Sequence, residues 1–290
     1  MVKPSATKNS AILLISCPDR KGLVAAIADF LYSHDGNILH ADQHQDAEQG
    51  VFLMRVEWDL DGFALDPAEV RDRFAPIADR LDMRWSLAFA SDRPRVAIFV
   101  SRDDHCLADL LYRHAAGELH CEIPLVVSNH PDARALADFH GIPFFDVPVT
   151  RDTKGAAEAR ALELLRRHDI DLVVLARYMQ ILSGDFTRAY TDRIINIHHS
   201  FLPAFVGARP YHQAFQRGVK LIGATSHYVT DVLDNGPIIE QDVIRVSHRD
   251  TVDDLIQKGR DLEKIVLSRA VRWHIENRIL LYDNKTVVFD

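Results

Sequence analysis

The fold of this chain is constrained most by a change of pattern at the polar segment Ser91-Asp92-Arg93-Pro94. Before it, apolar runs and amphipathic stripes follow the order strand, helix, strand, strand, helix, strand, which is the split βαβ pattern of ferredoxin-like folds. After it, short apolar runs alternate with helical stretches, which predicts a doubly wound, mostly parallel α/β sheet. We therefore expect two domains, a small one over residues 8–90 and a larger α/β domain over residues 95–290.

The predicted elements follow from apolar periodicity and from the turn residues between them. In the first domain, strands are expected at 11–16, 38–45, 51–58 and 83–89, and helices between 23 and 34 and at 67–81. In the second domain, strands are expected at 96–101, 124–128, 144–147 and 172–176, and helices at 104–115, 131–140, 153–168 and 251–277. Gly259 would weaken the last helix, and a terminal hairpin is expected from strands at 279–282 and 286–289.

Composition and charge argue against several classes of function. The 290 residues are 47% hydrophobic and carry 34 basic against 42 acidic side chains, and the net charge of −8 argues against a nucleic-acid partner. No apolar run approaches the roughly 20 residues that span a bilayer, so no membrane partner is expected, and the N-terminus lacks a signal-peptide pattern. Cys17, Cys106 and Cys121 are odd in number and lack metal-like spacing, which indicates reduced thiols in a cytoplasmic protein.

The segment 193–237 carries an amide, imidazoles and carboxylates in a pattern suited to acyl transfer. Asn196 and His198 are two apart on a predicted strand, so their side chains share a face near its carboxyl end, where open α/β sheets bind ligands. Such hydrogen-bond donors stabilise a carbonyl oxygen as it becomes an oxyanion. Asp231 or Asp234 could then act as the base for the attacking nucleophile.

Spacing alone leaves plainer alternatives open. An Asn-x-His pair on a strand is more often incidental than catalytic, and an Asp before Asn-Gly-Pro is more often a simple turn residue. His198 and His199 are adjacent on a strand and point to opposite faces, so they would chelate a metal ion poorly. No metal site is therefore predicted.

Two motifs in this segment, NIHHSFLP at 196–203 and HYVTDVLDNGP at 227–237, resemble the formyltransferase family that uses 10-formyltetrahydrofolate. The resemblance covers about residues 95–245. It implies a catalytic set of Asn196, His198 and Asp234, with Asp231 as the earlier, non-catalytic Asp of the same motif.

The stretch LARYMQILS at 175–183 resembles the folate-pocket segment of that family. The resemblance implies that backbone and apolar side chains of this stretch hold the pterin. The expected substrate-binding residues are Arg177, Tyr178, Met179, Gln180, Ile181, Leu182, Gly207 and His227. His227 would support Asp234 or line the pocket, and the plainer alternative is a histidine that fills space on its strand.

The family resemblance leaves the formyl acceptor open among a ribonucleotide amine, a charged tRNA, a sugar amine and water. In the glycinamide ribonucleotide enzymes of the family, a loop rich in glycine and serine cradles the phosphate of the acceptor. The corresponding loop here, SRDDHC at 101–106, has no glycine and carries two carboxylates that would repel a phosphate, although Arg102 works against this argument. A tRNA acceptor would favour a basic C-terminal extension, and this chain is acidic.

The N-terminal domain resembles an ACT domain, with CPDRKGL at 17–23 as its first strand-to-helix turn. Because ACT domains bind amino acids at subunit interfaces, the resemblance implies an effector site at Asp19, Arg20 and Gly22 and a homo-oligomer, either a dimer or a tetramer. The alternative is a plain turn that precedes a helix.

An ACT domain ahead of a formyltransferase domain resembles the family of formyltetrahydrofolate deformylases, and DHCLADLL at 104–111 and FLPAFVGARPYHQA at 201–214 are similar to its motifs. The resemblance implies hydrolysis of 10-formyltetrahydrofolate to tetrahydrofolate and formate, within one-carbon and purine metabolism and without a cofactor beyond this folate substrate. Arg209, Tyr211 and His212 would close over the site and exclude a bulky amine, unless they form an ordinary surface loop. The alternatives are a formyltransferase with an amine acceptor such as glycinamide ribonucleotide, and a non-catalytic sensor of folate or an amino acid.

Overall fold

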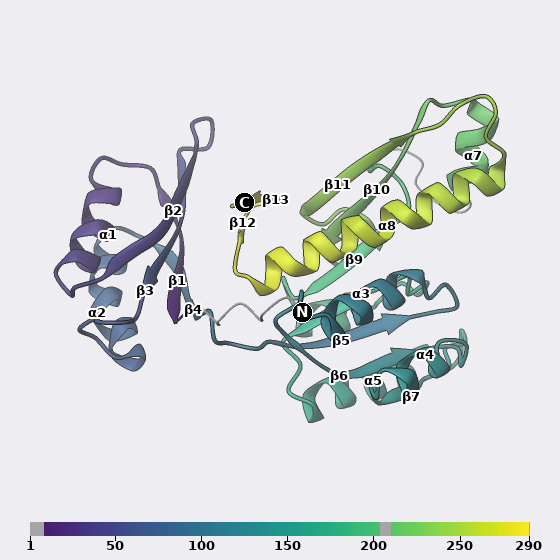
Figure 1. Ribbon diagram of the computed structural model, residues 1–290, viewed down its shortest axis with the longest axis horizontal. Helices are drawn as coiled ribbons and strands as arrows, with labels where there is room; N and C mark the ends of the chain where they lie inside the picture. Colours follow the sequence, from purple (N-terminus) through teal and green to yellow (C-terminus); the bar gives the residue numbers. More distant parts are fainter. Residues whose placement is uncertain (1–8, 204–209, 290) are drawn as a thin grey trace. The chain divides into compact units, whose positions relative to one another are not determined.

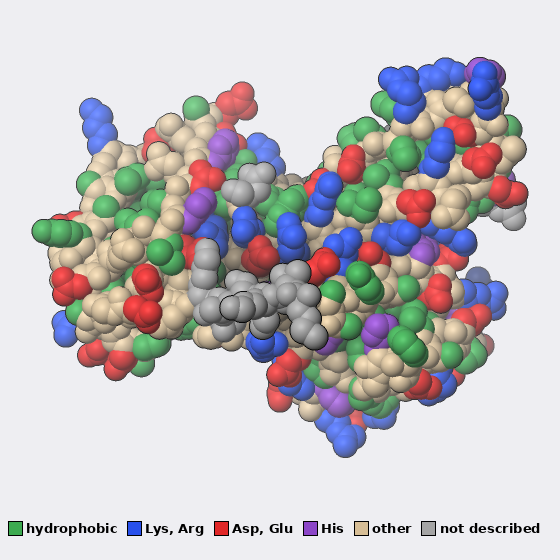
Figure 2. Space-filling model, viewed as in Figure 1, with side chains coloured by type: hydrophobic (Ala, Val, Ile, Leu, Met, Phe, Trp, Pro, Cys, Tyr) green, Lys and Arg blue, Asp and Glu red, His purple; other side chains and the backbone are tan. Residues whose placement is uncertain are grey.

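The computed structural model describes residues 9–203 and 210–289, which divide into two compact units (Figure 1). The first unit contains the described residues up to Asp92 together with those from Glu276 onward, and the second runs from Arg93 to Ile275. Among the described helices, none is both long and apolar enough to cross a membrane. Acidic and basic side chains are interspersed over much of the face shown in Figure 2.

The first unit is built on a four-stranded antiparallel sheet in the order β2-β3-β1-β4. Its elements are β1 (Ser10–Pro18), α1 (Leu23–Tyr32), β2 (Asn37–Asp46), β3 (Val51–Asp59), α2 (Pro67–Arg80) and β4 (Arg84–Phe89). Leu13 and Ile15 of β1 and Val56 and Trp58 of β3 form a core with the apolar stripes of α1 and α2. The βαββαβ order confirms the predicted ferredoxin-like fold.

The second face of this sheet is covered by the C-terminal hairpin of β12 (Ile279–Tyr282) and β13 (Lys285–Val288). Leu14 and Leu53 point to this face because side chains alternate along a strand, and they cluster with Phe289. The compact units thus place 276–289 with the first unit, whereas the sequence pattern groups these residues with the α/β domain.

The second unit holds a seven-stranded sheet in the order β11-β10-β9-β8-β5-β6-β7. Its strands are β5 (Arg95–Val100), β6 (Glu122–Ser128), β7 (Phe144–Asp146), β8 (Leu172–Leu175), β9 (Ile194–His198), β10 (Leu221–Tyr228) and β11 (Ile238–Arg245). The pairs within β9-β8-β5-β6-β7 are parallel, and β10 runs antiparallel to both of its neighbours. This confirms the predicted doubly wound, mostly parallel sheet.

The helices of this unit are α3 (His105–Ala115), α4 (Arg134–Phe139), α5 (Lys154–Arg167), α6 (Gly184–Ala189), α7 (Pro210–Arg217) and α8 (Val252–Ile275). Helices α5 and α6 pack on one face of the central strands, where Ala97, Phe99, Val173 and Leu175 point. Helix α8 contacts α3, β9, β10 and β11. The short helices α6 and α7 and strand β11 were not predicted; α7 follows the segment 204–209, which lies outside the described residues.

The strand order creates one edge where a ligand site is expected. From β5 the chain adds β6 and β7 on one side, and then returns to add β8 and β9 on the other. At such a switch point the loops after neighbouring parallel strands diverge and leave a crevice at their carboxyl ends. The loops after β5, β8 and β9 therefore meet at one edge, and they contain most of the residues singled out from the sequence.

Candidate active site

The pairing of β9 with β10 brings the first polar side chains together. In this antiparallel pair Asn196 lies opposite His227, and His198 lies opposite Thr225. Directly opposed residues on neighbouring strands project to the same face and touch each other. Asn196 and His227 therefore form a cross-strand pair, which the sequence motif alone does not reveal.

The hydrogen bonds of His227 fix the orientation of Asn196. Nδ1 of His227 lies 2.9 Å from the backbone oxygen of Tyr228, which can only accept, so Nδ1 carries the proton. Nε2 is then an acceptor, and Asn196 Nδ2 donates to it at 3.2 Å. Burial lowers the pKa of His227, so the imidazole stays neutral and keeps this acceptor. The second N–H of the Asn196 amide remains available to a substrate oxygen.

His198 lies between a carboxylate and the open space of the site. Its Nδ1 lies 3.4 Å from Asp234 Oδ1, and its Nε2 is buried without a hydrogen-bond partner in the described structure. A buried ring nitrogen without a partner is costly, and such groups concentrate where a ligand supplies the missing hydrogen bond. The His198 imidazole lowers the pKa of Asp234, more than partial burial raises it, so Asp234 is ionised at neutral pH.

The turn that carries Asp234 depends on Gly236. Tyr228 donates its backbone N–H to the oxygen of Pro237 at 2.9 Å, so the chain doubles back onto the end of β10. A Cβ at Gly236 would overlap the Tyr228 carbonyl, so only glycine fits. Asp234 itself is left-handed with φ 53°, a conformation that is uncommon outside glycine and is favoured at functional sites.

The loop that follows β9 is anchored by one buried hydroxyl. Thr225 Oγ1 donates to the oxygen of Ser200 at 2.9 Å and accepts from the amide of Leu202 at 3.0 Å and from Gln241 Nε2 at 2.9 Å. Gln241 also donates to the oxygen of Leu202 at 3.0 Å. These bonds fix the backbone immediately after His198 and His199.

A cavity of about 700 Å³ opens over these groups. Its lining includes the predicted Asn196, His198, Asp234, His227, Arg177, Tyr178, Met179, Gln180, Ile181 and Leu182, with Tyr211 and His212 of α7. Gly207 and Arg209 lie outside the described residues. Asp231 is exposed at the rim. The structure thus brings the predicted catalytic set and the predicted folate segment to one cavity.

The predicted folate segment is held by the residue that follows β5 and by a residue of α5. Ser101, at the end of β5, accepts from the amide of Met179 at 2.9 Å and donates to Asn129 Oδ1 at 2.7 Å. Glu158 of α5 accepts from the amide of Ser183 at 3.0 Å. The apolar side chains between these anchors are consequently left free to face a ligand, and Met179 and Ile181 are 56% and 61% exposed.

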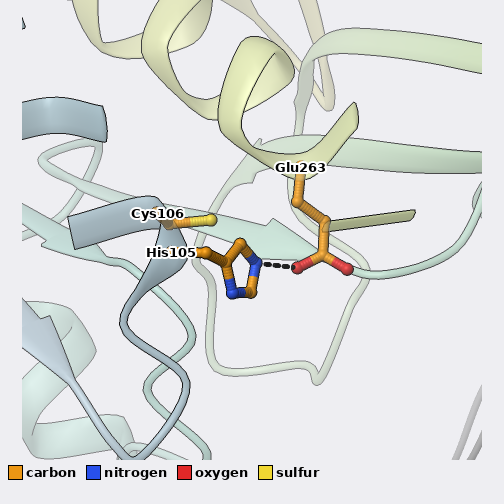
Figure 3. Close-up of side chains that lie close together, drawn as sticks. All are labelled: His105, Cys106 and Glu263. Atoms are coloured by element: carbon orange, nitrogen blue, oxygen red, sulfur yellow. Dashed lines mark hydrogen bonds and ion pairs between the residues drawn. The ribbon is translucent and has the colours of Figure 1, made fainter. Parts of the chain in front are cut away.

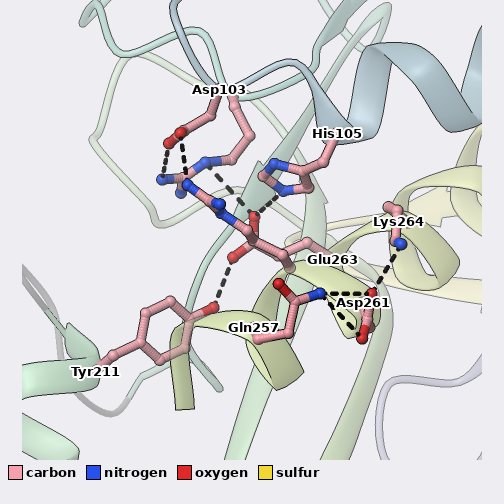
Figure 4. Close-up of polar contacts among 9 residues, drawn as sticks. Asp103, His105, Tyr211, Gln257, Asp261, Glu263 and Lys264 are labelled. Atoms are coloured by element: carbon pink, nitrogen blue, oxygen red, sulfur yellow. Dashed lines mark hydrogen bonds and ion pairs between the residues drawn. The ribbon is translucent and has the colours of Figure 1, made fainter. Parts of the chain in front are cut away.

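A buried polar network that the sequence did not reveal lines the same cavity (Figure 4). Glu263 of α8 is 1% exposed; its Oε1 accepts from the Tyr211 hydroxyl at 2.6 Å, and its Oε2 lies 2.8 Å from His105 Nε2. Arg177 bridges the network, with Nε 3.5 Å from Glu263 and Nη2 donating to Asp103 at 3.1 Å. We call these five residues the acceptor-side network.

Gly259 is the sequence signal that could have indicated this network. A Cβ at Gly259 would overlap the hydroxyl and ring of Tyr211. Glycine is unfavourable inside a helix, so its presence in α8 marks a close approach by another group rather than the weak point predicted from the sequence.

His105, Cys106 and Glu263 place one ligand atom each within 4.8 Å of one another, which is metal-like spacing (Figure 3). The chemistry of the group fits a cation poorly. Glu263 already bonds His105 and Tyr211, and the Arg177 guanidinium lies against it. Burial also raises the pKa of the Cys106 thiol well above its usual value, which disfavours the thiolate that a metal requires.

A second cavity, of about 350 Å³, lies in the first unit. Its lining includes the predicted effector residues Asp19, Arg20 and Gly22, together with Gln43, His44 and Gln45 of β2. Gln45 Nε2 donates to Asp19 at 2.5 Å, and Arg20 pairs with Asp82 at 2.7 Å. Gly22 has φ 92° and no side chain to cap the first amides of α1.

Comparison with known proteins assigns a family to each part of the chain. The family model for formyl transferase matches residues 94–271, and that for the ACT domain matches residues 11–79. The formyltetrahydrofolate deformylase of Synechocystis sp. is 58% identical over 280 residues, which are 97% of this chain and 98% of that protein. The chain belongs to the formyltetrahydrofolate deformylase family.

Solved structures agree with this membership. A formyltetrahydrofolate deformylase from Pseudomonas syringae pv. tomato has a TM-score of 0.96 at 52% identity, covering 98% of this chain and 95% of that chain. Glycinamide ribonucleotide transformylase 1 from Symbiobacterium toebii has a TM-score of 0.65 at 32% identity and covers 71% of this chain and 98% of that chain. The predicted family is thereby confirmed, and the roles of individual site residues stay predictions.

Proposed function

We propose that this protein hydrolyses 10-formyltetrahydrofolate to tetrahydrofolate and formate at the cavity that Asn196, His198 and Asp234 line. The observation that carries the proposal is their convergence on a space of about 700 Å³ with an apolar folate segment beside them. Family membership over nearly the whole chain supports the same reaction.

In the first step, a water molecule attacks the formyl carbon while Asp234 takes its proton. The carboxylate is ionised, and it lies 3.4 Å from His198 Nδ1, so both residues can bind the same attacking water on the cavity side. The water oxygen bonds to carbon, and the formyl C=O electrons move to oxygen to give a tetrahedral oxyanion. The free N–H of Asn196 and the Nε2–H of protonated His198 donate to that oxyanion, and such donors typically contribute 10²–10³-fold each in rate.

In the second step, the bond between the formyl carbon and N10 breaks. The electron pair leaves with N10, which takes a proton from His198 or from water, and the oxyanion closes to a carbonyl. Formic acid then loses its proton and leaves as formate. His227 positions Asn196 throughout, because a neutral His227 Nε2 accepts from the amide and orients its remaining N–H.

The folate is held by the stretch from Arg177 to Leu182. Exposed apolar side chains at Met179 and Ile181 would cover the pterin, and burial of each would stabilise the complex by about 1.5–3 kcal/mol. Ser101 and Glu158 fix the backbone amides of Met179 and Ser183, so the remaining backbone groups can face the pterin edge.

The test supplies purified protein with 10-formyltetrahydrofolate and water alone. We expect formate and tetrahydrofolate in equal amounts, because water is the only acceptor present. Folate binding without formate would contradict the proposal and would favour a sensor. Formate that appears only after an amine is added would favour a formyltransferase.

For the cavity of the first unit, we propose that a small amino acid binds as an effector. The uncapped amides at the start of α1 suit a carboxylate, and the Asp19 side chain suits an ammonium group. Calorimetry with a panel of amino acids should give heat for at least one, and Asp19→Asn should abolish it. Asp29→Asn, at an exposed position of α1, should leave the heat unchanged. No heat with any amino acid at millimolar concentration would reject the site.

A further inference from the structure

Four of the five residues of the acceptor-side network line the same cavity as the catalytic groups. We propose that Asp103, His105, Arg177, Tyr211 and Glu263 fill and close this side of the cavity, so that water is the acceptor and a phosphorylated amine is excluded. The proposal rests on the hydrolysis proposed above and names the residues that set its acceptor specificity.

The network shares the cavity with the catalytic set but comes from other elements. Asp103 and His105 lie at the start of α3, and Tyr211 and Glu263 belong to α7 and α8 (Figure 4). Arg177 follows β8. Asp103, Arg177, Tyr211 and Glu263 line the same 700 Å³ cavity as Asn196, His198 and Asp234. The Tyr211 ring lies 6.2 Å from that of His199, the residue next to His198.

The network is closed because its carboxylates are already paired and its Arg177 guanidinium is buried. Both Glu263 oxygens have donors, from Tyr211 on one side and from His105 on the other. Nη2 of Arg177 bonds Asp103 and its Nε lies 3.5 Å from Glu263. Nε and Nη1 are buried and have no hydrogen-bond partner among the described residues, so a phosphate would reach them only after the network opens. A buried charge is strongly disfavoured without its partner. An incoming acceptor that displaced these groups would therefore bind at a high cost in free energy.

Two charges at this side of the cavity are partly open, and they are paired with each other: the Arg260 side chain is 44% exposed and its Nη2 lies 3.1 Å from Asp103. The Asp103 side chain is 35% exposed and pairs with Arg177 and Arg260, each at 3.1 Å. Burial alone would raise the pKa of Asp103, but the bond from Arg177 and the two guanidinium charges lower it, so the carboxylate is ionised at neutral pH. In this position a phosphate dianion meets the Asp103 carboxylate and an Arg260 guanidinium that this carboxylate already neutralises, where an acceptor site would present amides or unpaired cations.

The glycine at position 259 allows Tyr211 to pack closely against α8. Only the missing side chain lets the Tyr211 hydroxyl lie against α8 and reach Glu263. If the network only connected α7 to α8, it would not need to line the cavity. In that case, breaking the network would also not allow a phosphorylated amine to bind.

The experiment opens the network and asks whether a phosphorylated amine now enters. The full-length wild type, Asp103→Ser, Glu263→Gln and the double variant are assayed for formate release from 10-formyltetrahydrofolate. Each is then assayed with added glycinamide ribonucleotide, which combines a ribosyl phosphate with a primary amine. We expect no inhibition of the wild type at millimolar ribonucleotide, and at least tenfold stronger inhibition or measurable formyl transfer in the double variant.

Controls separate this inference from the proposed function. Glu163→Gln removes a carboxylate of the exposed Arg160–Glu163 pair on α5 and should leave the insensitivity to ribonucleotide unchanged. If the double variant does not fold, Asp103→Ser carries the test, because Asp103 is partly exposed and Arg177 keeps Glu263 as a partner in this variant; we expect at least threefold stronger inhibition. Folded variants that release formate and resist the ribonucleotide as well as the wild type would overturn the inference alone. A wild type that releases no formate in water would overturn the proposed function instead.

Discussion

Replacing Gly259 by alanine tests whether the close packing of Tyr211 on α8 is as tight as the structure indicates. At an unconstrained helical position this change stabilises a protein by about 0.5–1 kcal/mol, because alanine restricts the unfolded chain and favours the helix. At Gly259 the new Cβ would occupy the space of the Tyr211 hydroxyl and ring, so the tyrosine must leave.

The cost can be worked out from the contacts that Tyr211 would lose. Its hydroxyl bonds the buried Glu263 carboxylate at 2.6 Å, and a hydrogen bond to a charged group is worth about 1.5–3 kcal/mol. Its ring is 8% exposed, and returning such a side chain to water costs about 1.5–3 kcal/mol. After subtracting the helix gain, Gly259→Ala should destabilise the second unit by about 2–5 kcal/mol.

Chemical denaturation followed by circular dichroism would measure this difference. Gly155→Ala is the matched control, because Gly155 lies in α5 and its Cβ would meet no atom within 4 Å. The control should be neutral or slightly stabilising. In a Tyr211→Ala background, Gly259→Ala should also cease to be destabilising, because the atoms it would meet are gone. Gly259→Ala as stable as the control in the wild-type background would refute the reasoning.

Three further predictions concern Gly236, His227 and His274. Gly236→Ala should abolish most formate release and lower stability, because its Cβ would overlap the Tyr228 carbonyl and displace Asp234; activity close to wild type would contradict this. His227→Phe should lower kcat about tenfold or more with little change in folate Kd, because Asn196 loses the acceptor that orients it, and an unchanged kcat would count against that role. Burial lowers the pKa of His274 to about 4, so stability is present above its unfolded pKa of about 6.5 and is lost as pH falls toward 4, by up to about 3 kcal/mol. His274→Gln, which can still accept from Tyr228, should show a smaller loss between pH 7 and pH 5 in denaturant titrations, and an equal loss would contradict the assignment.

Much of the fold could be predicted because the signals for it are local. Apolar runs bounded by turn residues predict the four strands of the first sheet and β5, β6, β7 and β8 of the second within a few residues, and the βαββαβ order before Ser91 predicts the first unit. The same is true of the motif around Asn196 and His198, whose two-residue spacing on a strand already places both side chains on one face.

The interactions that could not be predicted join residues far apart in the chain. The pairing of Asn196 with His227 depends on β10 running antiparallel to β9 in a particular register. The sequence motifs alone do not indicate this register. The bond between His105 and Glu263 links α3 to α8 and has no signal in either segment alone. The hairpin after Glu276 was predicted as an element, but its packing on Leu14 and Leu53 follows from tertiary structure.

Unpredicted short elements have a related cause. Helices α6 and α7 contain six and eight residues, too few to show an apolar period clearly. Strand β11 is only partly buried, so its sequence lacks the continuous apolar run that marks the central strands. These elements are defined by what they pack against rather than by their own pattern.

The most direct test of the account compares formate release by the wild type and by Asp234→Asn. Asparagine keeps the size of the side chain and removes the base, so we predict that the Kd for 10-formyltetrahydrofolate stays within a few-fold while kcat falls by about 10²–10⁴-fold. Asp231→Asn, at the exposed rim, is the matched control and should retain activity. A folded Asp234→Asn protein that releases formate at the wild-type rate would contradict the central claim.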